Sequence, residues 1–296
     1  MTLSILVGIA CHNRREFTKR CLQVLQATKP RQLQLNICVL DDGSQDGTAR
    51  MVQQEFPKIE IEIGDGEFYW AKSMSILHHK MKEQEYDGFL MLNDDVKLLN
   101  SSLDDLYEAV SIYPKTIIVG AMMDSEQRTT YSGLRCIAEG NYYRLKMQIP
   151  TNDFLFIDSF VGNFVYIPKS VSSSIGFLNG EYSHHYADVE YGIRASKSGI
   201  PILLMPKHMG ICESNSVRTG YLNGDISLLK RLIELNSRFC YPIRDHFRFF
   251  QNIGGKLWMC YFLRSYLGKV LLTLFPFLNG ANFPGITHSK NSDRPA

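Results

Sequence analysis

An apolar run that ends in two adjacent acids constrains this chain more than any other segment. Phe89 to Leu92 are apolar throughout and too short a run for a helix, so they predict a buried strand. Asn93, Asp94 and Asp95 follow directly. Two neighbouring carboxylates beside a dry strand end are costly to bury unless a positive charge joins them. The natural partner is a hard divalent cation, Mg²⁺ or Mn²⁺, which proteins usually share with a phosphate group.

Strands and helices alternate through the first half of the chain. Short apolar runs predict strands over 3–10, 35–40, 59–63 and 89–92, and apolar residues at helical spacing predict helices over 15–26, 48–56, 69–82 and 102–112. The second half is less regular, with strands expected over 117–122, 160–167 and 202–205, a helix over 188–198 and helices from 228 onward. This order predicts an α/β fold with a mostly parallel sheet flanked by helices.

Three of the expected strands end in polar clusters. The clusters are residues 11–13 (Cys-His-Asn), 41–44 (Asp-Asp-Gly-Ser) and 93–95 (Asn-Asp-Asp). Open α/β sheets bind ligands beyond the carboxyl ends of their parallel strands. If these strands are parallel, all three clusters lie at one edge of the sheet, and the sequence predicts a ligand site there.

The segment from Asp42 to Lys72 points to a nucleotide. An ionised carboxylate offers only acceptors, so Asp42 can accept the imide N–H of uracil or thymine. The alternative is a turn followed by a helix cap. Gly64 and Gly66 permit a close backbone approach, and Lys72 on the next helix can reach a diphosphate. A lone Gly-x-Gly is usually only a turn, so this signal is weak.

The start of the helix over 188–198 offers a candidate base. Asp188 and Glu190 lie within its first turn, where a carboxylate is either a general base or a simple helix cap. Trp70 and Glu190 are predicted to face an acceptor, because aromatic rings stack well on the apolar faces of sugars. The alternative for Trp70 is a core position in its helix.

Composition excludes some classes of protein. A net charge of +2 over 296 residues gives no global argument for nucleic-acid binding. The seven cysteines are scattered without a CxxC pair, which is typical of reduced thiols in a cytosolic protein. The first ten residues carry no basic leader, and no stretch of about 18 uncharged apolar residues predicts a membrane-spanning helix.

The region from 230 to 269 is basic and aromatic. Lysine and arginine recur there among Phe, Tyr and Trp, and the acids are Glu234 and Asp245. Such a stretch suits an anionic membrane surface. The alternative is a set of helices packed on a catalytic domain with solvated charges. We therefore expect a catalytic domain over 1–222 (nucleotide half 1–100, acceptor half 101–222), a helical region over 223–283 and a flexible tail over 284–296.

Taken in order, the motifs resemble those of the inverting family 2 glycosyltransferases, which have the GT-A fold. The resemblance spans residues 3–213 and rests on segments 41–44 with 46–48, 92–95, 162–168, and 188–195 with Gly199. Tyr131-Ser132-Gly133 and residues 162–165 resemble the rhamnosyltransferase-type branch of surface polysaccharide pathways.

This resemblance implies a metal-dependent transfer of a sugar from a nucleotide-diphosphate sugar to a glycan or lipid-linked glycan acceptor. Asp42 matches the carboxylate that recognises the pyrimidine, so UDP or dTDP is favoured over GDP. Asp95 matches the ligand of Mn²⁺ or Mg²⁺, and Asp188 matches the catalytic base. The remaining nucleotide-binding positions are Ala10, Asn13, Asp41, Lys72 and Asp94. The implied location is the cytoplasm, with peripheral contact at the inner face of the membrane.

Two departures from the family pattern keep alternatives open. Asn93 stands where many members have Asp, and Cys212 stands where many place a histidine, with His208 a poor substitute. One alternative is a catalytically silent relative that binds a nucleotide sugar or glycan. Another is a nucleotidyltransferase, although such enzymes usually carry a glycine-rich basic signature near the first strand, and this chain lacks it.

Overall fold

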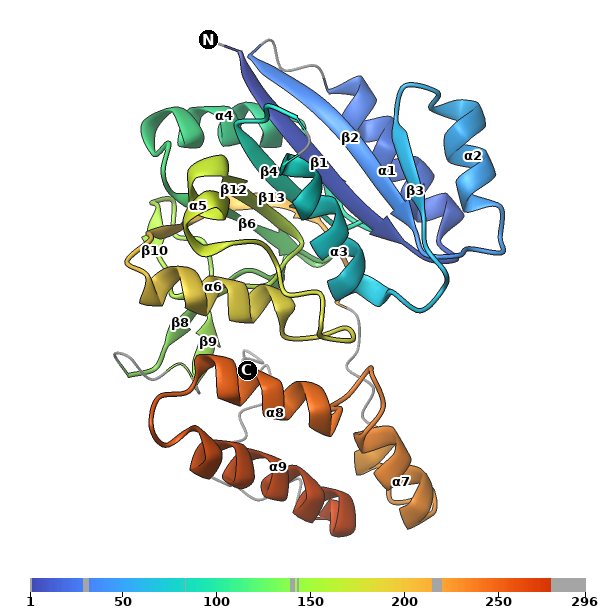
Figure 1. Ribbon diagram of the computed structural model, residues 1–296, viewed down its shortest axis with the longest axis vertical. Helices are drawn as coiled ribbons and strands as arrows, with labels where there is room; N and C mark the ends of the chain where they lie inside the picture. Colours follow the sequence, from blue (N-terminus) through green and yellow to red (C-terminus); the bar gives the residue numbers. More distant parts are fainter. Residues whose placement is uncertain are drawn as a thin grey trace. The chain divides into compact units, whose positions relative to one another are not determined.

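The computed structural model describes residues 2–28, 32–82, 84–138, 142, 144–214 and 220–277. The chain forms two compact units, Met1–Asn215 and Ser216–Ala296, and Figure 1 shows the elements of each. Our domain boundary at 222 stays a prediction, and the tail expected over 284–296 lies outside the described residues.

A mixed sheet forms the centre of the N-terminal unit. Its strands follow the order β10-β13-β6-β12-β4-β1-β2-β3, with β5 paired to β13 and β7 to β6. The strands are β1 (Leu3–Cys11), β2 (Leu33–Asp41), β3 (Glu60–Ile63), β4 (Gly88–Leu92), β5 (Lys97–Leu98), β6 (Ile117–Met123), β7 (Thr129–Tyr131), β10 (Leu155–Phe156), β12 (Phe164–Pro168) and β13 (Ile202–Ile211). A smaller sheet has the order β11-β8-β9, from Ser159–Phe160, Gly133–Cys136 and Leu145–Met147.

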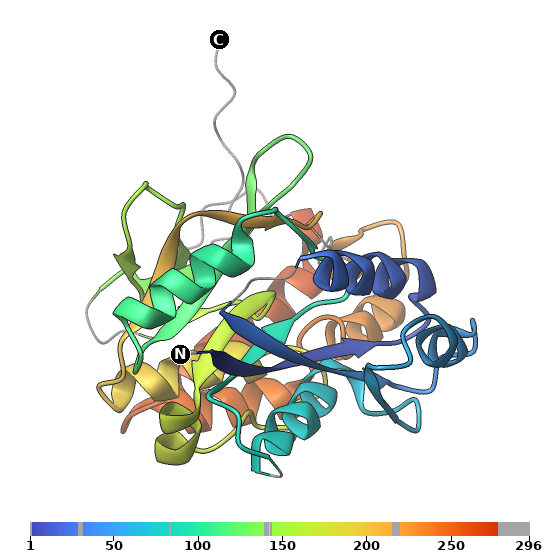
Figure 2. The same cartoon turned by 90° about the horizontal axis from the view of Figure 1, so that it is seen from above.

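Helices cover both faces of the large sheet (Figure 2). They are α1 (Arg15–Ala27), α2 (Thr48–Glu55), α3 (Tyr69–His79, continued by a 3₁₀ turn), α4 (Ser102–Ile112), α5 (Lys169–Ile175) and α6 (Ala187–Lys197). Side chains alternate along a strand, so Val7 packs with α1, α2 and α4 in one core, whereas Leu6 packs with α3, α5 and α6 in the other. Strand β4 is buried along its whole length, as its unbroken apolar run predicts.

The parallel part of the sheet agrees with the alternation of the first half. Strand β1 pairs in parallel with β2 and β4, and β2 pairs in parallel with β3. The second half differs, because β12 runs antiparallel to both β4 and β6. The single strand expected over 160–167 is two strands, β11 and β12, separated by a turn at residues 161–163. That turn lies beside the carboxyl end of β4, since Asn93 N donates to Asn163 O at 3.1 Å.

The C-terminal unit is helical, as the sequence predicts from 228 onward. It contains a 3₁₀ turn (Gly220–Leu222) followed by α7 (Leu228–Leu235), α8 (Ile243–Ile253) and α9 (Trp258–Leu274). An aromatic cluster joins α8 to α9, where Phe247 meets Phe262 edge-on at 5.3 Å between ring centroids. Within the described part of the chain, no helix is both long enough and apolar enough to cross a membrane.

Candidate active site

The polar segments that follow β1, β2 and β4 meet at one edge of the sheet. Strand β1 lies between β2 and β4, and all three point the same way. After the strands end, Asp42 N donates to Cys11 O at 2.9 Å, and Asn13 N donates to Ser44 Oγ at 2.8 Å. The side chain of Asn13 also accepts from Gln45 N at 2.7 Å. The fold therefore produces the convergence that the strand order predicted.

Asp42 is buried within the segment that leads into α3. Its Oδ1 accepts from Gly66 N at 2.9 Å, and its Oδ2 accepts from Tyr69 N at 2.8 Å. A Cβ at Gly64 would lie 2.5 Å from Asp42 Oδ1, so this approach requires glycine. Each carboxylate oxygen has two lone pairs, which leaves Asp42 one acceptor site per oxygen for a ligand N–H.

Asp41 is buried beside Asp42 and is only half satisfied. Its Oδ1 accepts from Ser44 N at 3.0 Å. Its Oδ2 has no hydrogen-bond partner among the described residues. A buried carboxylate oxygen without a partner is unfavourable, so a ligand or water donor would stabilise it.

The acidic pair after β4 binds Arg14, the residue that precedes α1. Arg14 Nη2 lies 2.7 Å from Asp95 Oδ2, and Arg14 Nε lies 3.5 Å from Asp94 Oδ1. Thr18 Oγ1 also donates to Asp94 Oδ2 at 3.2 Å. Burial raises the pKa of Asp94 to about 7, an effect that Arg14 opposes and Asp95 reinforces. The positive partner that the two carboxylates need is thus present within the chain.

Cys212 lies at the same pair. Its Sγ donates to Asp95 Oδ1 at 3.4 Å and accepts from Asn163 Nδ2 at 3.6 Å. Burial, reinforced by the charge of Asp95, raises the pKa of this thiol. His208 is bonded elsewhere, with its Nε2 2.8 Å from Thr129 Oγ1. Of the two residues considered as replacements for the family's histidine, Cys212 is therefore the one at the acidic pair.

Asp188 is the second residue of α6. Its Oδ2 accepts from Gly162 N, and its Oδ1 accepts from its neighbour Val189 N, each at 2.8 Å. Burial raises the pKa of Asp188 above the ordinary value, while these two hydrogen bonds and His185 act in the opposite direction. A raised pKa with retained acceptor capacity suits a general base.

Trp70 connects the three acidic positions. It follows Tyr69, whose backbone binds Asp42, and its Nε1 donates to Asn93 Oδ1 at 2.8 Å. A Cβ at Gly162 would lie 2.8 Å from Trp70 Cη2, so the indole packs directly on Gly162, whose N–H binds Asp188. The half-buried Trp70 side chain thus contacts Asn93, beside Asp94, and Gly162, whose N–H binds Asp188, while the preceding Tyr69 N–H binds Asp42.

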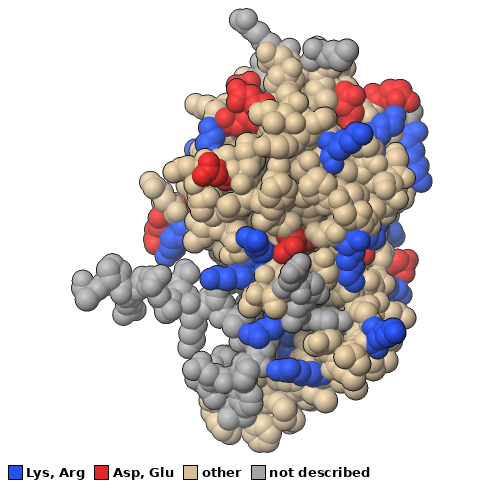
Figure 3. All heavy atoms as spheres, turned by 90° about the vertical axis from the view of Figure 1, so that its left-hand side faces the viewer, with Lys and Arg blue, Asp and Glu red and all other residues tan. Residues whose placement is uncertain are grey.

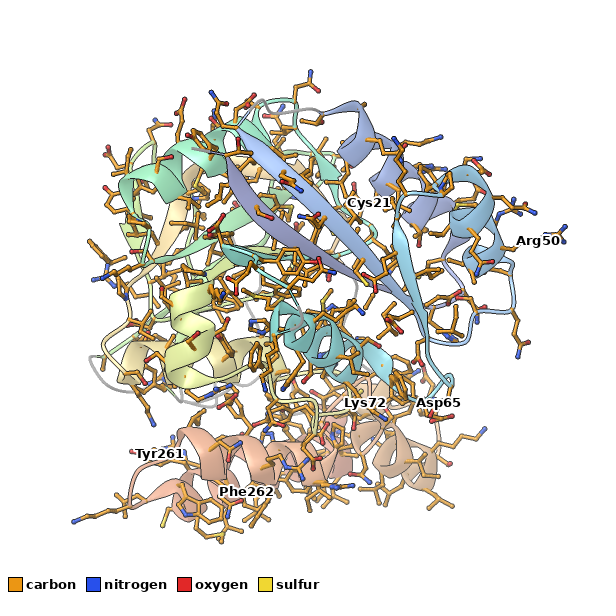
Figure 4. All side chains as sticks on the ribbon, turned by 45° about the horizontal axis from the view of Figure 1, so that its top comes forward. Cys21, Arg50, Asp65, Lys72, Tyr261 and Phe262 are labelled. Carbon is orange, nitrogen blue, oxygen red and sulfur yellow. The ribbon has the colours of Figure 1, made fainter. Side chains whose placement is uncertain are left out.

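The other predicted residues lie around this centre. Ala10 is opposite Leu40 near the end of β1. The exposed Lys72 on α3 places its ammonium 3.8 Å from the ring centroid of Phe68, and Figure 4 labels Lys72 and the nearby Asp65. Glu190 is buried and accepts from Arg194 Nε at 3.1 Å, so an acceptor hydroxyl would have to share its oxygens with that guanidinium.

Left-handed backbone conformations occur at the site. Asn13, Tyr69 and Tyr186 have φ values of 52°, 54° and 78°. Such angles are uncommon outside glycine, and for a bulky residue they indicate strain. Each of these residues lies within two positions of a residue singled out above. Sequence patterns do not show φ, so this feature could not be predicted.

Sequence analysis missed the roles of Arg14 and Thr18. Only the position of Arg14, directly after the polar cluster at the end of β1, could have indicated that it lies at the site. Its contact with Asp95 joins residues 81 positions apart, which no local pattern reveals.

A divalent cation fits this site only in part. Asp94 and Asp95 are oxygen ligands of the kind that Mg²⁺ and Mn²⁺ prefer. However, Arg14 binds Asp95, and a neutral thiol such as Cys212 is a poor ligand for a hard ion. Among the described residues, no group of three or more His, Cys, Asp or Glu side chains is placed to hold a metal. The protein alone does not supply a full ligand set, so phosphate oxygens would have to complete it.

Solved structures with this fold include several glycosyltransferases. The S. aureus TarS 1–349 structure with UDP-GlcNAc is 13% identical, with a TM-score of 0.56 over 95% of this chain and 92% of that one. GalNAc-T7 with UDP, GalNAc and Mn²⁺ is 11% identical, with a TM-score of 0.57 over 96% of this chain and 58% of that one. The mannosyltransferase PcManGT from Pyrobaculum calidifontis, with GDP-Man and Mn²⁺, is 12% identical, with a TM-score of 0.51 over 96% of this chain and 78% of that one.

These likenesses establish the GT-A type of α/β fold. No curated protein matches the chain by sequence. The family described as "Glycosyl transferase family 2" does match, over residues 6–169, which is more than half of the chain and includes the segments of Asp42, Asp94 and Asp95. The chain therefore belongs to glycosyl transferase family 2.

Proposed function

We propose that this chain transfers a sugar from a nucleotide-diphosphate sugar to an acceptor hydroxyl, with inversion at the anomeric carbon. The observation that carries the proposal is the short series of contacts through Trp70, which connects Asp42, the Asp94–Asp95 pair and Asp188. A donor needs groups for its base and its diphosphate, and an acceptor needs a base. This edge of the sheet offers candidates for all three.

The donor half of the site consists of Asp42 and its neighbours. Asp42 accepts the imide N–H of uracil or thymine through the lone pairs that Gly66 and Tyr69 leave open. Ala10, Asn13 and Asp41 lie beside the nucleoside, and Asp94 lies against the ribose or the sugar. Lys72 is long and exposed enough to reach the diphosphate. This arrangement favours UDP or dTDP donors over GDP donors.

The transfer step uses Asp188 as the base. Asp188 removes the proton from the acceptor hydroxyl, whose oxygen attacks the anomeric carbon from the face opposite the diphosphate. The bond to the diphosphate oxygen breaks, and its electron pair leaves with the diphosphate. Trp70 and Glu190 lie near the acceptor side, where an indole can stack on a sugar ring. A divalent cation, held by Asp95 and the phosphates, would neutralise charge on the leaving group.

A second part of the proposal concerns the acceptor's location. One face of α9 carries an exposed apolar stripe at helical spacing, which we call the α9 stripe: Met259, Leu263, Leu267, Leu271 and Leu274. A contiguous exposed apolar surface marks an interaction site. Basic residues accompany it, with Lys256 and Arg264 both exposed. Figure 3 shows several Lys and Arg side chains on the one face of the C-terminal unit that it presents.

We assign the α9 stripe to the surface of an anionic membrane. A lipid surface accommodates both the leucines, which enter the acyl boundary, and the flanking cations, which meet the head groups. A lipid-linked glycan would then be held near a cytoplasmic enzyme. The rhamnosyltransferase-type branch and a role in surface polysaccharide synthesis, which rest on residues 131–133 and 162–165, are narrower forms of the same proposal.

The donor can be identified by ligand-induced stabilisation. The purified chain is heated with UDP-, dTDP- and GDP-sugars in the presence of Mn²⁺, and the bound donor is then followed for hydrolysis and transfer by NMR of the anomeric proton. We expect stabilisation by a UDP- or dTDP-sugar and a product of inverted configuration. Stabilisation without any turnover would favour the silent relative, and absence of both would contradict the proposal.

The membrane contact is tested separately by co-sedimentation with vesicles. We expect binding to vesicles that contain anionic lipid at low salt, and weaker binding as salt is raised, because the cations are screened. If the chain does not bind such vesicles, the α9 stripe is better explained as a surface that packs against protein.

A further inference from the structure

The cation at the acidic pair is a side chain of the protein itself. Arg14 contacts both carboxylates, whereas Asp94 and Asp95 are nearly inaccessible, with side-chain exposures of 4% and 9%. The Arg14 side chain is 34% exposed. Two almost buried carboxyl groups are therefore held by one guanidinium that is partly exposed to solvent.

We infer that Arg14 is an exchangeable counter-cation, which occupies Asp95 in the free protein and gives it up when a nucleotide diphosphate and a divalent cation bind together. This inference rests on the proposed function. A guanidinium 2.7 Å from Asp95 Oδ2 and a divalent ion on the same oxygen would repel each other strongly, so the two occupants exclude one another.

The surroundings of Asp95 explain why the cation alone does not displace Arg14. The other carboxylate oxygen, Oδ1, accepts from the Cys212 thiol. A hard ion that removed Arg14 would gain at most the two carboxylates, which also accept from Thr18 and Cys212, and no third strong ligand from the described residues. A diphosphate changes this balance, because it supplies oxygens to the ion and is itself a good partner for a guanidinium.

Local geometry allows Arg14 to move without disturbing the fold. Its carbonyl oxygen accepts from Thr18 N at 3.0 Å, which fixes the backbone at the start of α1. The guanidinium itself rests 4.9 Å from the ring centroid of Phe17, an exposed side chain. Only the side chain has to rotate from the carboxylates toward a phosphate, while Thr18 continues to hold Asp94.

The exchange predicts a coupling between ligands. Coupling between two binding sites is reciprocal, so UDP should tighten Mn²⁺ binding by the same factor by which Mn²⁺ tightens UDP binding. A merely structural Arg14 would stabilise the site in every state, and its removal would loosen the acidic pair and weaken Mn²⁺ binding.

The test is a titration of the full-length chain with Mn²⁺, followed by the electron paramagnetic resonance signal of the free ion, with and without UDP. We expect weak binding to the wild type alone and binding at least ~10-fold tighter with UDP, since couplings of 5–150-fold are typical. Without UDP, Arg14→Gln should bind Mn²⁺ at least ~10-fold more tightly than wild type. Arg15→Gln, which changes the exposed neighbour, is the matched control and should behave as wild type.

Two results would overturn the inference. One is a folded Arg14→Gln protein that binds Mn²⁺ no more tightly than wild type in the absence of nucleotide. The second uses wild type, so it does not depend on the variant's folding: Mg²⁺ alone shifts the Nε–H resonance of Arg14 as fully as Mg²⁺ with UDP does. Failure of the wild type to bind UDP or dTDP under any condition would instead contradict the proposed function, whereas the comparison of wild type with Arg14→Gln in the absence of nucleotide still decides the role of Arg14.

Discussion

The two units of the chain differ in the buried acids and the exposed apolar groups that they offer to a ligand. In the N-terminal unit, Asp41, Asp42 and Asp94 are buried at the carboxyl ends of the parallel strands β2 and β4. The C-terminal unit buries His246 and Asp245 and leaves the leucines of the α9 stripe exposed. Figure 4 labels Phe262, which is buried, beside Tyr261 on the same helix.

This difference indicates what each unit binds. Buried acids with incomplete partners suit a small polar ligand that brings its own donors or a cation. Exposed leucines with flanking cations suit the surface of a membrane, whose acyl chains are apolar and whose head groups are anionic. In our proposal the first unit carries out the chemistry and the second binds a membrane, and the following predictions test this division.

The largest effect is expected for Asp188→Asn in the N-terminal unit. Asparagine keeps the size of the side chain but cannot accept a proton, and loss of a positioned base lowers the rate about 10²–10⁴-fold. Donor affinity, measured by calorimetry, should be unchanged, while transfer, measured as product formed per second, should fall by this factor. Normal turnover would remove Asp188 from the mechanism.

The pH profile of wild type gives an independent check of the same residue. Burial raises the pKa of Asp188, so its protonated, inactive form persists to higher pH than for an ordinary aspartate. We expect kcat/KM to fall on the acid side with an apparent pKa above 3.8, and this limb should disappear in the residual activity of Asp188→Asn.

The next effect belongs to the α9 stripe. Leu263→Asp with Leu267→Asp places two charges where the stripe would enter the lipid, and removes apolar burial of about 1.5 kcal/mol or more per leucine. We expect vesicle affinity to fall roughly 100-fold or more, with transfer to a soluble acceptor unaffected. Ile149→Asp, at an exposed position of the N-terminal unit, is the control and should leave vesicle binding intact. If Ile149→Asp lost as much vesicle affinity as the double variant, membrane binding would not belong to the C-terminal unit alone.

A smaller effect is expected at the contact between Gly162 and Trp70. A Cβ at position 162 would lie 2.5 Å from Met91 Sδ and 2.8 Å from Trp70 Cη2, so Gly162→Ala forces these groups apart. Overpacking of this kind costs about 1–3 kcal/mol of unfolding free energy. Transfer should slow as well, because Trp70 and the N–H that binds Asp188 both shift. Gly255→Ala, where an added methyl group meets no atom within 4 Å, should change neither stability nor rate.

The smallest effect, a gain in stability, is expected in the C-terminal unit. Burial lowers the pKa of Lys269 from 10.5 to about 8, and its ammonium lies 4.1 Å from the ring centroid of Tyr241. Protonation of Lys269 therefore disfavours the folded state. Its contribution to the free energy of unfolding is least favourable below pH 8 and becomes more favourable as the pH rises from 8 to 10.5. Lys269→Met should raise stability at pH 7 by about 1–2 kcal/mol, after allowance for the lost cation–π contact.

Thermal unfolding followed by circular dichroism measures this gain, with Lys256→Met as the exposed control. The difference between Lys269→Met and wild type should shrink above pH 8. A difference that stays constant with pH would show that packing, and not charge burial, controls this position.

Patterns of local sequence were sufficient for the elements that carry the donor half of the site. The helix expected over 102–112 matches α4 residue for residue, and the buried run at β4 was predicted from its apolar residues alone. The order of the strands predicted that the polar clusters at their ends meet, because parallel strands fix which ends lie together.

The remainder depends on contacts between distant residues. The antiparallel β12 and the turn at 161–163 come from pairing with β4 and β6, to which the apolar run over 160–167 gives no clue. Arg14 at Asp95, Arg194 at Glu190 and Trp70 on Gly162 are likewise set by tertiary packing. The sequence shows where the charges and apolar runs are, but tertiary packing determines which partner each charged side chain has.

The most direct measurement is a crystal structure of the chain with UDP and Mn²⁺. The account predicts that the uracil ring hydrogen-bonds to Asp42, that the diphosphate lies at the Asp94–Asp95 pair and that Asp188 faces the space beyond the β-phosphate. UDP bound at another surface, or Asp188 turned away from that space, would contradict it.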